Sequence, residues 1–339
     1  MKVLVTGATG FIGGNLTRAL LDRGYTVRAL VRRGSDRHNL RGLDAEPFVG
    51  DLTEPATLEP ALRGCEGLFH VAASYTFWTP DPARVYGANV TGTENILSAA
   101  ARADVSRIVY TSSESTLDIT GDEPVLNARP EKLPGHYKRS KCLAEGKVLA
   151  MAGGGLPVVV VNPTTPIGEH DIKPTPTGRI IIDYLNGKMP AFVNTGLNAI
   201  DVRDVAAGHI LAMEKGTPGE RYVLGNRNVT LRELFLILEE LTGIKAPRYS
   251  IPLWTALAAG YFDEFFNGKL RGREPRIPVD AVRAAHRVRF FDCSKAVAEL
   301  GLPQTPVEKA FQRAINWFME NGYARGAREG AAVGPAADA

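Results

Sequence analysis

Short apolar runs alternate with longer amphipathic segments along the first half of the chain. The runs are rich in Val and Ile and bounded by turn residues, and several are continuously apolar, as expected for strands buried on both faces of a parallel sheet. They occupy residues 2–6, 25–31, 46–50, 67–73, 107–113 and 156–162. Intervening segments such as 11–23 and 82–102 space apolar residues three or four positions apart and predict helices. The alternation predicts an α/β fold, a Rossmann doubly wound parallel sheet with helices on both faces.

The pattern loosens after about residue 164. Residues 162–178 are rich in Pro and Gly and predict a long loop, and loops of such length are often functional. Two later helices are clear: one begins after Thr230 as N-cap and ends at Gly243, and the other lies within 305–322. We expect this half to form a smaller mixed α/β C-terminal substrate lobe over the carboxyl edge of the sheet.

These patterns divide the chain into three parts. We expect residues 1–165 to form the dinucleotide-binding domain, with later segments such as 190–225 returning to it. Residues 166–323 would form mainly the substrate-binding lobe. The Gly- and Ala-rich stretch 324–339 is predicted to be a disordered tail.

Charge and cysteine content argue against a nucleic-acid-binding, disulfide-rich or metal-binding protein. The 339 residues have a net charge of +3 with the bases spread along the chain, so no nucleic-acid partner is indicated. The three cysteines are isolated and the histidines form no close pair, which predicts neither disulfides nor a metal site. No apolar stretch reaches the ~20 residues of a membrane span, and the first ten residues do not match a signal peptide. We expect a cytoplasmic protein.

Three glycines follow the first predicted strand and open the first predicted helix. Gly7, Gly10 and Gly13 have the spacing GxxGxxG, a variant of the GxGxxG dinucleotide fingerprint. Glycine allows a tight turn and brings backbone N–H groups against a pyrophosphate, assisted by the helix N-terminus. A dinucleotide cofactor is therefore predicted.

The residues after the second predicted strand select between the two nicotinamide cofactors. An acid there would bind the adenine ribose of NAD, whereas an arginine suits the additional phosphate of NADP. The chain has Arg32 and Arg33 at this point, with Asp36 nearby. NADP is favoured, and NAD remains possible.

Tyr137 and Lys141 lie four residues apart within a predicted helix and so share one face. A free tyrosine titrates near ~10, and a neighbouring ammonium would lower that pKa and make the phenol useful in acid–base chemistry. A serine run at 112–115 ends the fifth predicted strand, at the edge where a hydroxyl would meet the cofactor.

Together these features resemble the extended short-chain dehydrogenase/reductase family, of the NAD-dependent epimerase/dehydratase type. The matching motifs are TGxxGxxG at 6–13, GDL at 50–52, HVAA at 70–73, NVTGT at 89–93, YTSS at 110–113, YxxxK at 137–141 and NP at 162–163. The resemblance implies that Ser113 provides the catalytic hydroxyl, Tyr137 is the acid/base and Lys141 tunes it and holds the nicotinamide ribose, while Asn89 steadies the site. The implied cofactor-binding residues are Gly7, Thr9, Gly10, Phe11, Ile12, Gly13, Arg32, Asp51, Leu52, Ala72, Ala73, Thr111, Tyr137, Lys141, Pro163 and Thr164. A homodimer is also implied.

A narrower resemblance covers nearly the whole chain. The stretches at 135–141, 161–181 and 185–198 are similar to the hopanoid-associated sugar epimerase group, also labelled dihydroflavonol-4-reductase-like. Two residues depart from that pattern: Glu114 follows the serine where a small residue is usual, and Asp201 stands where histidine is common. Both departures are expected to affect the substrate pocket.

Three further features concern the substrate. Tyr75 follows the fourth predicted strand and would lie over the substrate or pack in its own loop, and Arg179 would bind an anionic group or face solvent. The aromatic segment 251–266 predicts a helix that serves as a lid, a membrane-surface face, part of the core or a dimer interface.

The predicted function is an NADP-dependent oxidoreductase that transfers hydride between nicotinamide and a carbonyl or hydroxyl carbon of a small molecule. One alternative is a sugar epimerase acting through a transient keto-sugar, linked to hopanoid biosynthesis. Another is a non-catalytic dinucleotide sensor.

Overall fold

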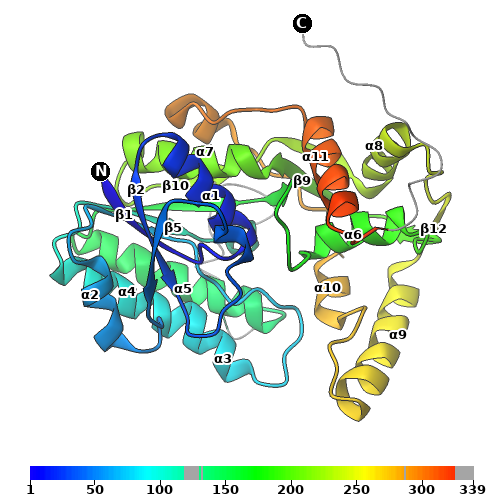
Figure 1. Ribbon diagram of the computed structural model, residues 1–339. Coiled ribbons are helices and arrows are strands. Elements are labelled where there is room, and N and C mark those ends of the chain that lie inside the picture. The colour runs from blue at the N-terminus through cyan, green and yellow to red at the C-terminus, as the bar shows by residue number, and fades with distance from the viewer. Residues whose placement is uncertain (118–129, 131–132, 286–287, 325–339) are drawn as a thin grey trace, which may run out of the picture.

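Two lobes lie side by side, the larger one from the first half of the chain and the smaller one mainly from the second (Figure 1). The computed structural model describes residues 1–117, 130, 133–285 and 288–324. The predicted tail therefore lies outside the described residues except for Ala324. That residue is buried in the apolar core of the smaller lobe, so its assignment to a tail was wrong.

Seven parallel strands form the central sheet, in the order β10–β6–β5–β4–β1–β2–β3. The chain winds outward in both directions from β1 and β4, which places the topological switch point between these two strands. The doubly wound prediction is confirmed. The strands are β1 (Lys2–Thr6), β2 (Thr26–Val31), β3 (Ala45–Val49), β4 (Gly67–His70), β5 (Arg107–Thr111), β6 (Val158–Pro163) and β10 (Arg221–Leu224).

Helices cover both faces of this sheet (Figure 1). On one face lie α1 (Phe11–Asp22) and α7 (Val202–Lys215), and on the other α2 (Leu58–Leu62), α4 (Gly92–Arg102) and α5 (His136–Gly153). In β1, Val3 and Val5 pack toward α1 and α7, whereas Leu4 packs toward the opposite helices. Burial of both faces explains why the strand sequences are continuously apolar.

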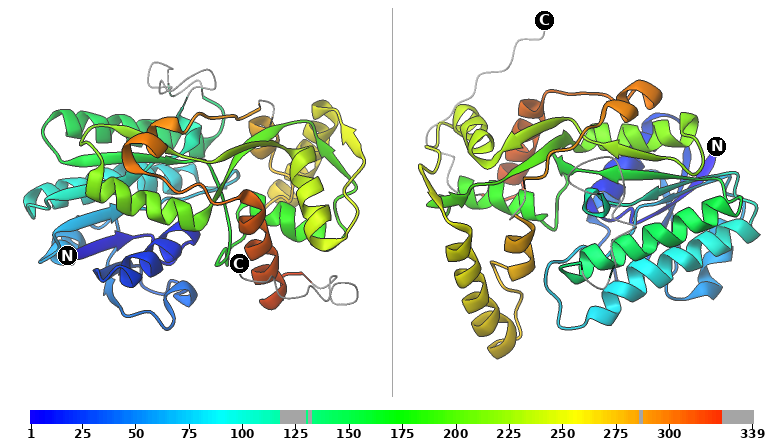
Figure 2. Two further views of the ribbon diagram at one scale, coloured as in Figure 1. Left: turned by 90° about the horizontal axis from the view of Figure 1, so that it is seen from above. Right: turned by 180° about the vertical axis from the view of Figure 1, so that it is seen from behind.

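The smaller lobe has its own apolar core, formed by α6 (Pro176–Leu185), α8 (Leu231–Thr242) and α11 (Val307–Glu320) against small sheets. One sheet has the order β11–β9–β7 and the other pairs β12 with β8. Their strands are β7 (Thr165–Ile167), β8 (Ala191–Val193), β9 (Gly196–Asp201), β11 (Arg227–Thr230) and β12 (Tyr249–Ile251). From this lobe α9 (Leu253–Asp263) projects beside α10 (Val279–Ala284) (Figures 1 and 2).

Local signals explain the boundaries of several elements. Thr230 and Glu233 form a capping box at the start of α8, and Gly243 ends it at φ +72°, as predicted. The predicted long loop is partly wrong, because Thr165–Ile167 pairs with β9 as an edge strand, where Pro166 is tolerated. Helix α3 (Pro82–Tyr86) leads into the π-helix Gly87–Thr91, and further π-helices lie at Glu264–Leu270 and Ala296–Leu300. Short 3₁₀ turns lie at His38–Leu40, Pro55–Thr57 and Glu114–Thr116.

Candidate active site

The glycine loop joins β1 to α1 by very close backbone contacts. Gly7 has φ +72°, and a Cβ atom on it would lie 2.7 Å from the Ala72 backbone nitrogen after β4. A Cβ atom on Gly13 would overlap the Gly7 carbonyl group, whose carbon would be 2.6 Å away. Only glycine fits at these two positions, so the start of α1 reaches the switch point of the sheet.

The N-terminus of α1 is open to an anion. Gly10 is its N-cap, and no side chain of the described residues caps the helix, which leaves the first N–H groups, at Phe11 and Ile12, available. The preceding carbonyls of Thr9 and Gly10 accept from the buried Asn39 Nδ2 at 3.4 and 3.1 Å. A rigid, uncapped helix start after a parallel strand fits the pyrophosphate of a dinucleotide.

Charged residues lie where the adenosine end of such a ligand would reach. Arg32 follows β2, is exposed and makes no ion pair within the described residues. Asp51 accepts hydrogen bonds from the Thr53 N–H at 2.8 Å and hydroxyl at 2.7 Å. Partial burial acts to raise the pKa of Asp51, but these bonds and the Arg32 charge hold that pKa below its usual value. The neighbouring Leu52 accepts from Asn95 Nδ2 at 2.8 Å through its carbonyl.

The structure brings Ser113 and Tyr137 together. Ser113 follows β5, Tyr137 lies in the first turn of α5, and the Ser113 side chain lies close enough to the Tyr137 hydroxyl to act on its pKa. The ring of Tyr75, from the loop after β4, meets the Tyr137 ring edge-on with centroids 4.7 Å apart. Three segments far apart in sequence thus converge at the carboxyl edge of the sheet.

Lys141 lies one turn after Tyr137 and is 2% exposed. Its Nζ atom donates to the Tyr110 hydroxyl at 2.9 Å and to the Thr111 carbonyl at 2.8 Å, so β5 holds the ammonium. Desolvation lowers the pKa of Lys141 to about 8, and the charge of Glu145 acts to raise it.

The pKa of Tyr137 differs from the prediction. Desolvation raises it to about 12, although the hydrogen bond with Ser113 works in the opposite direction. The charge of Glu114 raises it further and that of Arg289 lowers it. The predicted lowering by Lys141 was wrong for this arrangement, because that ammonium is bound to β5.

Asn89 ties three parts of the site together from within the π-helix, a local irregularity often found at functional sites. It is buried, accepts from the Ser74 N–H at 2.6 Å and donates to the Ser74 carbonyl at 3.1 Å. It also donates to the Ser140 hydroxyl at 2.9 Å. Asn89 therefore positions both the Tyr75 loop and the helix that contains Tyr137.

A buried carboxylate behind the site was missed in the sequence. Glu145 is 0% exposed and accepts from the Ser112 and Thr116 hydroxyls, the latter at 2.6 Å, and from Asn162 Nδ2 at 3.1 Å. Arg221 from β10 pairs with it at 3.4 Å. The available signal was the spacing of Tyr137, Lys141 and Glu145, four residues apart on one helix face.

Two buried histidines beneath the sheet edge were also missed. His209 Nδ1 donates to the Val205 carbonyl at 2.7 Å, so its Nε2 accepts from the Thr111 hydroxyl at 2.8 Å. Desolvation lowers the pKa of His209 to about 4 and that of His70 to about 3. Both rings are neutral, and they fix the ends of β4 and β5 through hydroxyl groups such as that of Thr6, 2.8 Å from His70 Nδ1.

The remaining predicted cofactor residues lie at the ends of β4 and β6. The Ala72 N–H donates to the Thr6 hydroxyl at 3.1 Å, and Ala73 follows it. The Thr164 N–H, directly after Pro163, donates to the Leu224 carbonyl at 3.0 Å. That N–H group is therefore already engaged within the protein and is not free to bind a cofactor.

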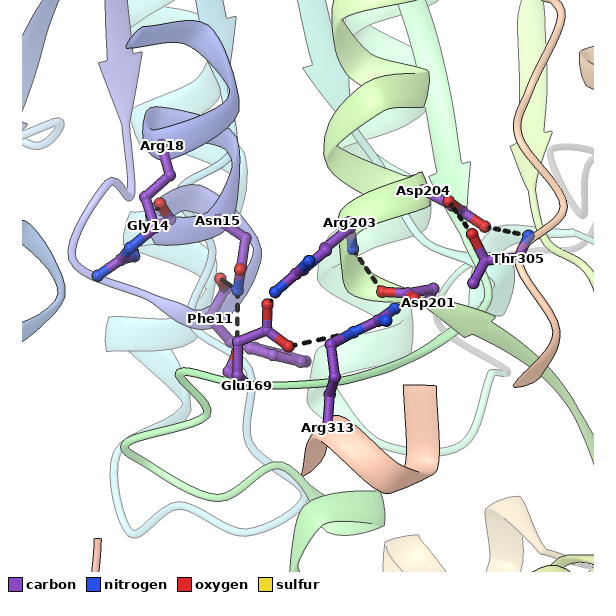
Figure 3. Close-up of polar contacts among 10 residues, drawn as sticks. All are labelled: Phe11, Gly14, Asn15, Arg18, Glu169, Asp201, Arg203, Asp204, Thr305 and Arg313. Carbon is purple, nitrogen blue, oxygen red and sulfur yellow. Dashed lines mark hydrogen bonds and ion pairs between the residues drawn. The ribbon is translucent and has the colours of Figure 1, made fainter. Parts of the chain in front are cut away.

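The two residues that depart from the group pattern both bind arginines. Glu114 pairs with Arg289 at 2.7 Å and lies close enough to Tyr137 to affect its pKa. Asp201 caps α7 at Arg203 N and pairs with Arg313 of α11, beside Glu169 (Figure 3). Glu114 lies near Tyr137, which agrees with the expectation that it affects the substrate pocket. Asp201 instead joins β9 to α11 through its contact with Arg313.

Arg179 is engaged in contacts within the protein. Arg179 pairs with Glu274 at 3.6 Å and donates to the Pro174 carbonyl at 3.3 Å, so its substrate role stays a prediction. No three metal-ligating side chains gather within the described ranges. Among the helices that the structure describes, none has the length and apolar character needed to cross a membrane.

Comparison with known proteins agrees with this geometry. The chain is 47% identical over 329 residues to a protein from Synechocystis sp. that is provisionally named a dihydroflavonol 4-reductase, with 95% of each chain covered. It is 38% identical to sterol demethylase protein B from Methylococcus capsulatus, covering 95% of this chain and 99% of that one. The crystal structure of gox2253 is 42% identical, with a TM-score of 0.83 over 95% of this chain and 99% of that one.

The family comparison covers the same segments that build the site. Residues 3–225, from β1 to the end of β10, match the NAD dependent epimerase/dehydratase family. An oxidoreductase or epimerase that uses NAD or NADP on a small-molecule substrate accounts for the glycine loop, the open helix start and the paired hydroxyls. The chain belongs to the NAD dependent epimerase/dehydratase family.

Proposed function

We propose that this protein is an NADP-dependent reductase that converts a carbonyl group of an apolar small molecule to an alcohol through Ser113, Tyr137 and Lys141. The observation that supports it best is the Ser113–Tyr137 hydroxyl pair, with the Tyr137 pKa raised to about 12. A phenol with so high a pKa holds its proton at neutral pH. Carbonyl reduction needs a proton donor of this kind beside the oxygen.

The roles of the three residues follow from their positions. A bound nicotinamide cofactor would supply the hydride. The Ser113 hydroxyl would hydrogen-bond the carbonyl oxygen, and the Tyr137 hydroxyl would donate its proton to that oxygen as negative charge develops. Lys141, one turn along α5 and bound to β5, would hold the ribose of the nicotinamide with its ammonium, and its burial makes this charge effective.

NADP is proposed because of the residues after β2. Arg32 is exposed, lacks an ion-pair partner within the described residues and acts on Asp51 through its charge. A guanidinium in this place suits the phosphate on the adenine ribose. NADPH also favours net reduction over an epimerase cycle, in which the hydride returns to the same substrate.

An apolar carbonyl substrate is proposed because Tyr75 packs against Tyr137 and Phe77 packs against Tyr75, with centroids 4.7 and 5.6 Å apart. The relatives named as acting on a dihydroflavonol and a sterol agree with this character. Glu114 beside Tyr137 is paired with Arg289 at 2.7 Å, so these two charges provide no net attraction for an anionic substrate group.

Substrate-dependent oxidation of NADPH tests the reaction. The purified protein is mixed with NADPH and either a dihydroflavonol or a sterol ketone, and the absorbance of NADPH is followed. Tyr137→Phe is expected to lower kcat about 10²–10⁴-fold, the usual range for a positioned acid. Tyr25→Phe, which removes a hydroxyl bonded to Glu214 at 3.0 Å on another surface, is the control. Tightly bound NAD together with no consumption of NADPH would indicate the epimerase instead.

Fluorescence titration tests the cofactor. Arg32→Ala is expected to weaken NADPH binding about 10–100-fold, the range of one charge-assisted hydrogen bond to phosphate. NADH binding should change less than about twofold. Arg41→Ala, a base of the same connecting segment beyond the turn, is the control. Equal effects of Arg32→Ala on the two cofactors would refute the assignment of NADP.

A further inference from the structure

Large apolar side chains gather on one exposed face of the projecting hairpin. We define the aromatic face as Trp254, Tyr261, Phe262, Phe265, Phe266 and Leu270, which are between 40% and 69% exposed. They recur at intervals of about one and two helical turns along α9 and the π-helical segment Glu264–Leu270. Figure 2 shows this hairpin extending away from the rest of the smaller lobe.

The opposite side of α9 accounts for the packing of the hairpin. Ala256 and Gly260 are buried, and a Cβ atom on Gly260 would lie 3.0 Å from the Ile277 carbonyl. These small residues let α9 approach the segment before α10 closely. The aromatic face is therefore directed outward, which is rare for so large an apolar surface without a partner.

Acids and bases next to the aromatic face differ in whether they are already bound within the protein. Asp263 Oδ2 accepts from the Ile277 N–H at 2.8 Å, and Glu264 Oε1 accepts from the Val279 N–H at 2.7 Å, so both acids are engaged within the hairpin. The bases Lys269, Arg271 and Arg273 are exposed at its tip, and the exposed Glu274 beside them pairs with Arg179 at 3.6 Å. Within the described part of the chain none of the three bases has a carboxylate partner.

We propose that this hairpin docks on an anionic phospholipid surface. Tryptophan, tyrosine and phenylalanine side chains insert favourably at the boundary between headgroups and acyl chains, and adjacent Lys and Arg attract anionic lipids. A second copy of the chain fits less well. Pairing two such faces tip to tip brings the three unpaired bases of each copy together, and the exposed acid beside them, Glu274, already pairs with Arg179 at 3.6 Å.

The position of the hairpin adds a functional consequence. A Cβ atom on Gly268 would lie 3.2 Å from Trp78 Nε1, so the tip touches the loop that also contains Tyr75. Tyr75 in turn packs on Tyr137. Docking would hold the Tyr137 site next to the bilayer, where an apolar substrate is dissolved. Docking itself does not depend on the proposed reductase activity.

Vesicle co-sedimentation tests the proposal with the full-length chain. Vesicles of phosphatidylcholine alone are compared with vesicles of equal parts phosphatidylcholine and phosphatidylglycerol. We expect binding to the anionic vesicles, weakened by salt, with a blue shift of the Trp254 emission. Each base near an anionic surface strengthens binding about fivefold, so the triple variant K269E/R271E/R273E, which removes three bases and adds three acids, should bind at least about 100-fold more weakly. The variant W254S/F262S should lose at least about tenfold.

Two controls keep the result interpretable. Leu236→Ser removes an exposed apolar residue of α8, and R232E/K309E reverses two exposed bases, both away from the hairpin; all should bind as the unmodified protein does. Circular dichroism checks that each variant is folded. The proposal is overturned if the protein binds neither vesicle, or if the hairpin variants and the controls bind equally. It is also overturned if light scattering shows a dimer that W254S/F262S dissociates, because a second copy would then cover the face.

Discussion

Glu145→Gln is the substitution that best tests how the site is supported. The side chain keeps its shape but loses its charge, at a position that is 0% exposed. One carboxylate oxygen accepts from Ser112, Thr116 and Asn162, and the other faces the Arg221 guanidinium at 3.4 Å. Glutamine can satisfy the three donors with its carbonyl oxygen, but its NH₂ group then faces Arg221, donor against donor.

The magnitude follows from these contacts. Hydrogen bonds to a charged group contribute about 1 kcal/mol more than neutral ones, and Arg221 is itself partly exposed, so its pairing is weakened by solvent. We expect the free energy of unfolding to fall by about 3 kcal/mol. The Glu145 charge also opposes the lowering of the Lys141 pKa, so the variant should have a lower Lys141 pKa than the present value of about 8.

Two measurements check this reasoning. Urea unfolding gives the change in stability, and the pH profile of kcat/KM for carbonyl reduction reports the Lys141 charge. The alkaline fall in activity should move to lower pH. Glu94→Gln is the matched control, because Glu94 pairs with Lys147 at 2.7 Å on the surface, where such pairs contribute about 0–1 kcal/mol. If Glu145→Gln and Glu94→Gln have equal stability and superimposable pH profiles, the support role of Glu145 is refuted.

Two further substitutions test other features. Gly13→Ala should weaken NADPH binding at least about tenfold and destabilise the fold by about 3 kcal/mol, because its Cβ would overlap the Gly7 carbonyl. Gly153→Ala is the control in the same titration, because its Cβ would meet nothing within 4 Å. His209 has a folded pKa of about 4, below its unfolded value, so its stabilising contribution is present above pH 6.5 and is lost as the pH falls toward 4. Between pH 7 and pH 5 the free energy of unfolding should fall by about 2 kcal/mol because of His209. Urea unfolding of His209→Gln should lack that part of the pH dependence. An unchanged dependence would show that His209 is not the group responsible.

The larger lobe was predictable because its signals are local. A continuously apolar strand, a glycine turn and an amphipathic helix each occupy a few consecutive residues, and their alternation allows few topologies. The predicted strands 67–73 and 107–113 were too long, since β4 ends at His70, opposite the end of β1 at Thr6, and β5 ends at Thr111. These earlier strand ends bring Ala72 and Ser113 to the candidate site.

The parts that could not be predicted depend on contacts between distant segments. In the sequence, Glu145 resembles an ordinary acid on a helix surface. Its partner Arg221 lies 76 residues later, in β10, so no local pattern indicates the ion pair. Asp201 likewise pairs with Arg313 of another element. In the segment 251–266, apolar content alone does not distinguish a buried helix from an exposed one. Only the packing of Gly260 shows which side is covered.

The buried Asn39 has a consequence for how the protein can be divided. Its Nδ2 atom bridges the carbonyls of Thr9 and Gly10 to that of His170, and Asn15 reaches the Glu169 carbonyl at 3.1 Å. The turn that would bind the cofactor is thus braced by chain beyond residue 165, a stretch that sequence patterns assign to the other lobe. A fragment truncated at residue 165 would lack both that brace and the edge strand β10. The first 165 residues therefore cannot be exchanged alone, and any chimera should exchange the segment 168–171 and strand β10 together with them.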